Sequence, residues 1–374
     1  MILSFKDFLS EQKQLLLMGG NVVLNGIPAE RVDLKKLSRT EVVNSLRIGL
    51  NAINDAFAKY AGFPLWSSDL FTSGDFLSGS AKWFFDLTSI DDERFKKVKS
   101  SVGDVDLQVD GAAQKIIEAF LNSLGAGTKL GTLEYIGSKY SADQQISLWH
   151  TNFGQTVQID FEFVEYAGGK PTPWSTFSHS SAWEDLELGI KGAFAKFYMR
   201  ALTARSTKDI ILLKGKKQVP TKTQSTEYVA SLKGIRNRIQ PVMDGDVHRH
   251  LDGLPVYTEL PSAGAKYFTD MDVFFSILFD AQPTDADLKD VNSFVGMIDI
   301  TKKYIKDRSE QQKIVDRFAE ILFGAGAQGI YRGREGRLLD FRDKTVALRY
   351  ICKELGLKWD QYLPMIRSYY RSYK

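Results

Sequence analysis

The sequence predicts an α+β fold, in which a small mixed β-sheet flanked by helices precedes a mostly α-helical C-terminal region. Over residues 39–60, apolar side chains recur every three or four positions, which is typical of a helix with one buried face. Over residues 155–164, apolar and polar side chains alternate, which is typical of a strand with one covered face. From Tyr267 onward, helix-like segments follow one another, separated by proline and glycine.

Composition places the chain among ordinary globular proteins. Its 374 residues are 43% hydrophobic and 25% charged, which is enough for two domains with hydrophobic cores. The formal net charge of +3 is too small to indicate a nucleic-acid partner by itself. One cysteine excludes an internal disulfide, and with four histidines it argues against a structural zinc site. No apolar run reaches membrane-spanning length, so we expect a cytoplasmic protein without a membrane partner.

The first half of the chain supplies the elements of the predicted sheet. Residues 1–38 form an N-terminal segment, and residues 39–180 form one domain that begins with the core helix. A second helix is expected over 111–124, after which three segments show strand-like patterns. The expected strands are 102–109, 132–136, 145–149 and 155–164.

The second half is expected to contain two further regions. Residues 181–266 comprise a connecting helix, from Ser181 to about Thr203, and then basic strands and loops. Ser181 and Glu184 have the spacing of a capping box, which favours a helix start at this point. Residues 267–374 form the helical C-terminal domain.

Two aspartates on the strand over 102–109 are the first candidate functional residues. Asp104 and Asp106 are separated by one residue, so in a strand both carboxylates point to the same face. Two like charges held close together are costly unless a cation lies between them. Mg²⁺ favours such a place, because it binds one or two carboxylates together with phosphate oxygens. Asp160, on the strand over 155–164, is a candidate third ligand, and Glu162 shares its face.

A Gly-Ser pair upstream has the character of a phosphate-binding turn. Gly79 and Ser80 follow a short apolar segment and precede what reads as a helix start. Glycine lets a phosphate approach the backbone, and the following N–H groups and hydroxyl can hold it.

This order of motifs resembles the DNA polymerase β-type nucleotidyltransferase superfamily, in its template-independent branch. The matching residues are Gly79 and Ser80, then Asp104 and Asp106, then Asp160 between two apolar residues, within about residues 70–165. One departure is the spacing: Gly79 and Asp104 are 25 residues apart, whereas members of the superfamily usually place the D-x-D pattern roughly a dozen residues after Gly-Ser. The additional stretch, 88–101, is charged and reads as an inserted loop or a short helix.

The resemblance implies a nucleotidyltransferase palm and a two-metal transfer of a nucleotide. Asp104, Asp106 and Asp160 would hold Mg²⁺ or Mn²⁺, while Gly79 and Ser80 would bind the nucleoside triphosphate, for which ATP is expected. Lys191, on the helix predicted after the palm, is the matching choice for a lysine that contacts the triphosphate. The expected acceptor is a hydroxyl on RNA, such as a tRNA end. No template-reading module is evident, which favours template-independent transfer.

Basic segments in the second half also bear on the acceptor. Lys214 to Lys217, Gly234 to Arg238 and Tyr331 to Arg337 are basic, and Arg367, Arg371 and Lys374 alternate with tyrosines. Such segments suit single-stranded nucleic acid, by charge and stacking, but they are equally typical of solvated loops and of helix packing. A second D-x-D pattern, Asp244-Gly245-Asp246, lies near two histidines, but its glycine favours a turn over a metal site.

Three other functions remain open from the sequence. A metal-dependent D-x-D glycosyltransferase would need a longer nucleotide-binding unit before the motif and would predict no third acid. The N-terminal F-x-x-F-L-x-E pattern, ending in Leu9-Ser10-Glu11, resembles proteins of large tailed bacteriophages, some of which are packaged in the phage head and trimmed there. The chain could therefore be a non-catalytic phage head or host-interaction protein that retains the fold. Finally, the nucleotide acceptor could be a protein hydroxyl.

Overall fold

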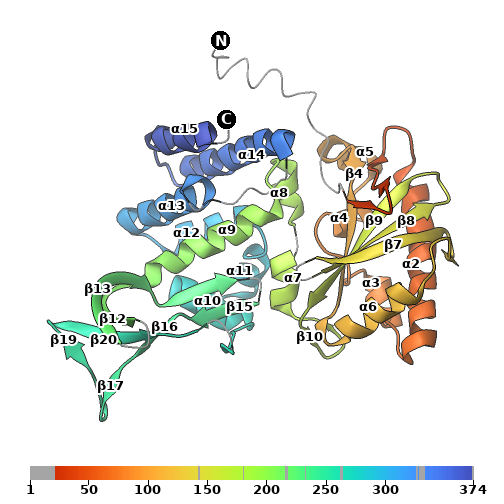
Figure 1. Cartoon of the computed structure of the whole chain (residues 1–374). Helices are drawn as coiled ribbons and strands as arrows, with labels where there is room; N and C mark the ends of the chain where they lie inside the picture. Colours follow the sequence, from red (N-terminus) through yellow and green to blue (C-terminus); the bar gives the residue numbers. More distant parts are fainter. Residues whose placement is uncertain are drawn as a thin grey trace. The chain divides into compact units, whose positions relative to one another are not determined.

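The chain forms two compact units in the computed structural model (Figure 1). The structure describes residues 22–141, 144–179, 181–214, 218–231, 233–261, 264–325, 327 and 333–372. The first unit consists mainly of residues up to Thr172, and the second begins at Pro173. Within the described residues, no helix has the length and apolarity needed to cross a lipid bilayer.

The first unit is built on a five-stranded mixed sheet, as the sequence predicts. In sheet order the strands are β5 (Asp104–Asp110), β9 (Thr156–Val164), β8 (Gln144–Thr151), β7 (Leu133–Ser141) and β6 (Lys129–Leu130). β5 and β9 are parallel, and the other neighbours are antiparallel. Two short strand pairs accompany it. β1 (Val23–Leu24) forms a hairpin with β2 (Ile27–Pro28), and β3 (Val32–Asp33) pairs with β4 (Ser101–Val102), which is distant in sequence.

Two amphipathic helices cover this sheet. α2 (Arg39–Ala61) starts at the N-cap Ser38 and ends at Gly62, whose positive φ of 84° closes the last turn. α6 (Gln114–Ser123) follows the short 3₁₀ turn η2 (Gly111–Ala113). The rings of Phe57 and Phe120 meet edge to face at 5.4 Å, so the two helices share one apolar core.

Three short helices lie between α2 and β5. They are α3 (Ser68–Ser73), α4 (Ala81–Phe85) and α5 (Asp92–Val98). The charged stretch over 88–101 therefore contains a short helix, α5, which is capped by the side chain of Asp91. Its single buried residue, Phe95, fixes it to the core of the first unit.

A buried arginine ties this whole stretch to α2. Arg39 has no exposed surface, and its guanidinium makes five hydrogen bonds. The acceptors are the carbonyls of Trp83, Phe84, Asp86 and Ile90 and the carboxylate of Asp92. The guanidinium also lies 4.6 Å from the ring centroid of Phe95. Arg39 thus satisfies backbone groups at the end of α4 and in the connection to α5 that would otherwise be buried without partners.

The second unit contains a second five-stranded sheet, which is larger than the basic strand and loop region expected over 181–266. Its strands are β13 (Val219–Thr226), β12 (Thr207–Lys214), β20 (Leu254–Glu259) and β16 (Ile239–Pro241), with β19 (His250–Leu251) paired to β20. β12 and β20 are parallel. Two hairpins accompany it, β14 (Tyr228–Ser231) with β15 (Gly234–Asn237), and β17 (Met243–Asp244) with β18 (Val247–His248).

The remaining part of the second unit is mostly helical, as predicted from Tyr267 onward. Its helices are α10 (Met271–Phe279), α11 (Asp285–Asp290), α12 (Phe294–Tyr304), α13 (Arg308–Phe323) and α15 (Leu363–Ser372). α14 (Gly333–Glu354) contains Gly333 to Arg337 of the basic segment, so these residues are helical; its residues up to Asp340 belong to the first unit. The second unit begins with α7 (Pro173–His179).

The helix predicted from Ser181 to about Thr203 is wrong. Two helices occupy this stretch, α8 (Trp183–Glu187) and α9 (Gly192–Leu202). Gly189 between them has a φ of 72°, a left-handed conformation that interrupts a helix. α8 has no side-chain cap, so the capping box expected at Ser181 does not form. Lys191 therefore sits at the N-cap of α9 instead of inside a long helix.

The role of Arg39 predicts a large loss of stability on its removal. Arg39→Met keeps an unbranched apolar stem but leaves several buried carbonyls without donors, so we expect a loss of about 3–5 kcal/mol in unfolding free energy. Lys59→Met on the exposed face of α2 is the matched control and should change stability by less than about 0.5 kcal/mol. Urea unfolding measures both values. Similar small changes in the two variants would contradict the anchoring role.

Candidate metal centre

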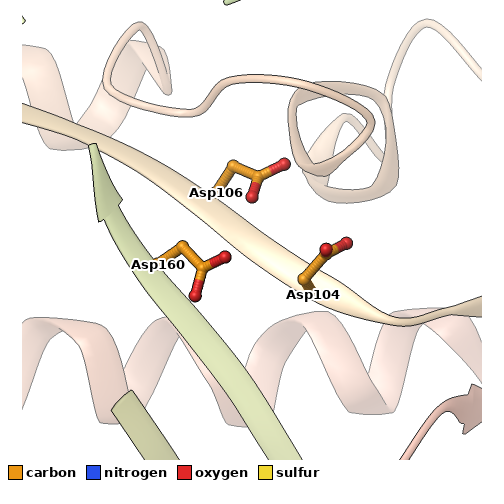
Figure 2. Close-up of side chains that lie close together, drawn as sticks. All are labelled: Asp104, Asp106 and Asp160. Atoms are coloured by element: carbon orange, nitrogen blue, oxygen red, sulfur yellow. The ribbon is translucent and has the colours of Figure 1, made fainter. Parts of the chain in front are cut away.

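Parallel pairing of β5 with β9 brings three aspartates together. In this register Asp106 lies beside Asp160, and Asp104 lies beside Gln158. Asp104 and Asp106 are alternate residues of one strand and point to the same side, where Asp160 joins them (Figure 2). The intervening Val105 is buried on the other face of β5. The proximity predicted for the three carboxylates is therefore confirmed.

The spacing of these carboxylates suits a divalent metal. One oxygen of each of Asp104, Asp106 and Asp160 lies within 4.8 Å of the others. Ligands on opposite sides of one Mg²⁺ are about 4 Å apart, so a small side-chain rotation is enough to complete a site. Asp160 is only 3% exposed, whereas Asp104 and Asp106 are partly exposed. The group thus combines a buried ligand with two that solvent, metal or substrate can reach.

Burial and neighbouring acids make two of these carboxylates, Asp106 and Asp160, reluctant to ionise. Burial, reinforced by Asp104, Glu162 and Asp160, raises the pKa of Asp106 well above its ordinary value. Burial also raises the pKa of Asp160 to about 7, against the opposing hydrogen bond from Gln158. A divalent cation would offset this cost by neutralising the negative charge, which is the behaviour expected of a set of metal ligands.

Gln158 holds Asp160 in position, a role that sequence reasoning did not assign. Its side-chain amide donates to both carboxylate oxygens of Asp160, at 3.0 and 2.8 Å. Gln158 is itself buried and lies two residues before Asp160 on the same strand face. Because alternate residues of a strand share a face, the sequence already placed Gln158 on the same side as Asp160, and this was the signal available for its role.

The Gly-Ser segment lies directly against the D-x-D strand. Ser78 N–H donates to the carbonyl of Asp106 at 3.0 Å, and Leu77 pairs with Leu107 in an antiparallel bridge. A Cβ placed on Gly79 would lie 2.5 Å from Oδ2 of Asp106, so a side chain at this position would displace the carboxylate. Gly79 also has a φ of 53°, which a larger residue rarely adopts. Both constraints explain why glycine occupies this position.

Two hydroxyls of the segment contact charged groups at the centre. Ser78 donates to Oε2 of Glu162 at 2.5 Å, which fixes a fourth acid beside the three aspartates. Ser80 lies at the start of α4 without capping it, and its hydroxyl accepts a hydrogen bond from Nζ of Lys99 at 2.5 Å. The structure therefore brings Gly79 and Ser80 together with the three aspartates.

Two cationic side chains, Lys99 and Arg31, interact electrostatically with the aspartates, and the sequence analysis identified neither of them. Burial lowers the pKa of Lys99, Asp104 and Asp106 act in the opposite direction, and Arg31 adds to the lowering. Arg31 in turn interacts electrostatically with Asp104 and donates from Nε to the hydroxyl of Ser101 at 3.0 Å. Lys99 belongs to the charged stretch over 88–101, and nothing in its sequence indicates which of its basic residues would lie near the aspartates.

Lys191 does not belong to the first unit, which contains the three aspartates. It belongs to the second unit, where its Nζ lies 3.9 Å from a carboxylate oxygen of the buried Asp343. This ion pair gives Lys191 a local partner within its own unit. Its proposed contact with a triphosphate remains a prediction.

The second D-x-D pattern and the C-terminal tyrosines have structural explanations, as far as the structure describes them. Asp244 and Asp246 are exposed at the turn between β17 and β18, and they belong to no group of three metal-ligating side chains among the described residues. Tyr369 is buried, packs against Phe323 and accepts a hydrogen bond from Lys344, which favours helix packing over stacking on nucleic acid. The phage-like N-terminal pattern and Lys374 lie outside the described residues.

Comparison with protein-family models, with curated proteins and with solved structures gives no match to this chain. Arguments about function therefore rest on the geometry of the centre.

The pKa of Asp160 predicts how the metal-free protein responds to pH. Its folded-state value of about 7 exceeds the usual value of about 4, so its stabilising contribution is complete below pH 4 and is lost as pH rises through 7. In EDTA at pH 8, Asp160→Asn should therefore be more stable than the wild type by about 2–4 kcal/mol, and the difference should shrink towards pH 5. Urea unfolding across this range measures the difference.

Asp55→Asn provides the matched control, because Asp55 is exposed on α2. It should follow the wild type at every pH. An Asp160→Asn variant that is less stable than the wild type at pH 8 would contradict the raised pKa of Asp160.

Proposed function

We propose that the protein is a metal-dependent nucleotidyltransferase, which moves a nucleoside monophosphate from a nucleoside triphosphate to an acceptor hydroxyl and releases pyrophosphate. The observation that carries the proposal is the joint placement of a glycine-serine turn and a third aspartate against one D-x-D strand. Gly79 touches Asp106 from one side, and Asp160 lies beside Asp106 on the neighbouring parallel strand. A metal site alone requires only the aspartates. The adjoining turn adds a place for phosphate groups.

Each residue has a defined role in this proposal. Asp104 and Asp106 are the ligands that bind the triphosphate-carrying metal, and Asp160 supplies the third carboxylate. Bound Mg²⁺ or Mn²⁺ would supply charge neutralisation for the attacking and leaving oxygens of an in-line displacement. The hydroxyl of Ser80 and the backbone N–H groups beside Gly79 hold the terminal phosphates. Asp160 is also the candidate acceptor for the proton of the attacking hydroxyl.

Gln158 and Ser78 support these roles by positioning acidic side chains, without contacting the reacting groups themselves. Gln158 fixes the carboxylate of Asp160, and Ser78 fixes that of Glu162. Ligands held in advance lose less conformational freedom when metal and substrate bind, which favours both binding and correct alignment.

The identity of the donor and the acceptor is a narrower part of the proposal. ATP is the expected donor, and RNA is the expected macromolecular acceptor. Exposed basic side chains on the second unit, such as Lys222 and Arg249, suit a polyanionic acceptor by charge. A glycosyltransferase is less well supported, because it has no need for the close approach of Gly79 to Asp106 or for Asp160.

Transfer of label tests the proposal directly. The purified protein is incubated with each α-³²P-labelled nucleoside triphosphate, Mg²⁺ or Mn²⁺ and total cell extract. We expect label on a macromolecule with the wild type and a loss of at least about 100-fold with Asp104→Ala, because removal of a metal ligand costs several kcal/mol of transition-state stabilisation. Sensitivity of the product to nuclease or protease then identifies the acceptor class.

The exposed second D-x-D pattern offers a matched control. The double variant Asp244→Ala, Asp246→Ala removes two carboxylates with the same spacing from the β17–β18 turn. It should label the acceptor like the wild type. Absence of label with every nucleotide and either metal, or equal labelling by Asp104→Ala, would contradict nucleotidyl transfer at this centre.

A further inference from the structure

The insertion that separates Gly79 from Asp104 delivers one lysine to the candidate metal centre. α5 is anchored by the buried Phe95, and the N–H of Lys99 donates to the carbonyl of Phe95 at 2.7 Å. Arg39 contacts the same helix through Asp92 and through the ring of Phe95. The backbone at Lys99 is therefore fixed to the core of the unit, and its side chain leaves from a defined point.

The side chain of Lys99 reaches the phosphate-binding turn and not a carboxylate. Its Nζ donates to the hydroxyl of Ser80 at 2.5 Å. Among the described residues no carboxylate lies within ion-pair distance of Nζ, although Asp104 and Asp106 are near enough to act on its charge. An ammonium group has three N–H donors, and Ser80 uses one of them. Two donors remain for a ligand that binds beside Ser80.

We propose that Lys99 binds the terminal phosphates of the nucleoside triphosphate beside Ser80, and thereby sets the preference for triphosphates over monophosphates. The proposal rests on the proposed nucleotidyltransferase function. It assigns a specific task to the stretch that departs from the spacing of the superfamily, because Lys99 lies near the end of that stretch and donates to Ser80.

The balance of charge around the centre supports this assignment. In their ionised, metal-binding form, Asp104, Asp106, Asp160 and Glu162 together carry more negative charge than the positive charge of Lys99 and Arg31. Divalent metals would reverse that excess, so the metal-loaded centre becomes positive and attracts a polyanion. Lys99 then no longer has to neutralise the aspartates. It is free to act on phosphate oxygens, for which a lysine on a fixed backbone is a suitable point charge.

Binding measurements on substrate analogues test the proposal without requiring turnover. The probes are the α,β-methylene analogues of the four nucleoside triphosphates, in which the bond that transfer would cleave is blocked, and the corresponding monophosphates, all with Mg²⁺. Calorimetry on the full chain should show that Lys99→Met weakens binding of the triphosphate analogue by about 10- to 100-fold and leaves monophosphate binding unchanged, as expected for loss of charged hydrogen bonds to phosphate. Lys99→Arg should retain most of the affinity.

Two further variants separate a specific role from a structural one. Lys97→Met removes the same charge from an exposed position on α5 and should bind both probes like the wild type. Lys99→Gln keeps a donor for Ser80, so it preserves the turn while losing the charge, and it should reproduce the selective defect. Unchanged triphosphate affinity in Lys99→Met and Lys99→Gln, or an equal loss for triphosphate and monophosphate, would overturn the role of Lys99 while leaving nucleotidyl transfer intact. Failure of the wild type to bind any triphosphate analogue would overturn both.

Discussion

The parallel register of β5 and β9 is the constraint on which the candidate centre depends. It sets Asp106 beside Asp160 and places three carboxylate oxygens within 4.8 Å of one another. Burial of these carboxylates, together with their like charges, opposes folding when they are ionised, as the raised pKa values of Asp106 and Asp160 indicate. A fold tolerates this cost at a functional site, and a divalent cation would relieve it.

The surrounding structure keeps the arrangement from relaxing. Gln158 holds both oxygens of Asp160, and the backbone of Ser78 pairs with that of Asp106. Gly79 leaves no space between its own backbone and the carboxylate of Asp106. At greater distance, Arg39 binds carbonyls in the last turn of α4 and directly after it, so the segments that carry Ser80 and Lys99 share one buried anchor. The side chains of Ser80 and Lys99 thus project from parts of the chain that are packed and hydrogen bonded.

Local patterns were sufficient to predict the elements of the centre. Alternation identified the strands that carry Asp104 and Asp160, and the helix pattern over 39–60 identified α2. Neither pattern states that β5 and β9 are neighbours or parallel, because pairing depends on contacts distant in sequence. The motif order alone suggested that the three aspartates would meet. Their proximity is shown by the structure, whereas the function of the centre is a proposal.

Local sequence patterns could not predict several other features, because these features depend on contacts between distant residues or on a choice of backbone conformation. Lys99 is one of several lysines in a charged stretch, and only the anchoring of Phe95 directs it towards Ser80. The helix expected after Ser181 is interrupted at Gly189, because a glycine inside a helical pattern permits a left-handed residue without requiring one. Lys191 accordingly sits at a helix start, paired with Asp343. The second sheet was underestimated because most side chains of β13 are polar and β16 has only three residues.

Binding of Mn²⁺ followed by electron paramagnetic resonance is the most direct test that Asp104, Asp106 and Asp160 form a metal centre. Titration of the full chain, with an α,β-methylene nucleoside triphosphate present, separates free from bound ion. The account predicts bound Mn²⁺ in the wild type and in Asp244→Asn, and a loss of at least about 10-fold in affinity for Asp106→Asn, because a neutral amide replaces an ionised ligand. Equal binding by the wild type and Asp106→Asn would contradict the central claim.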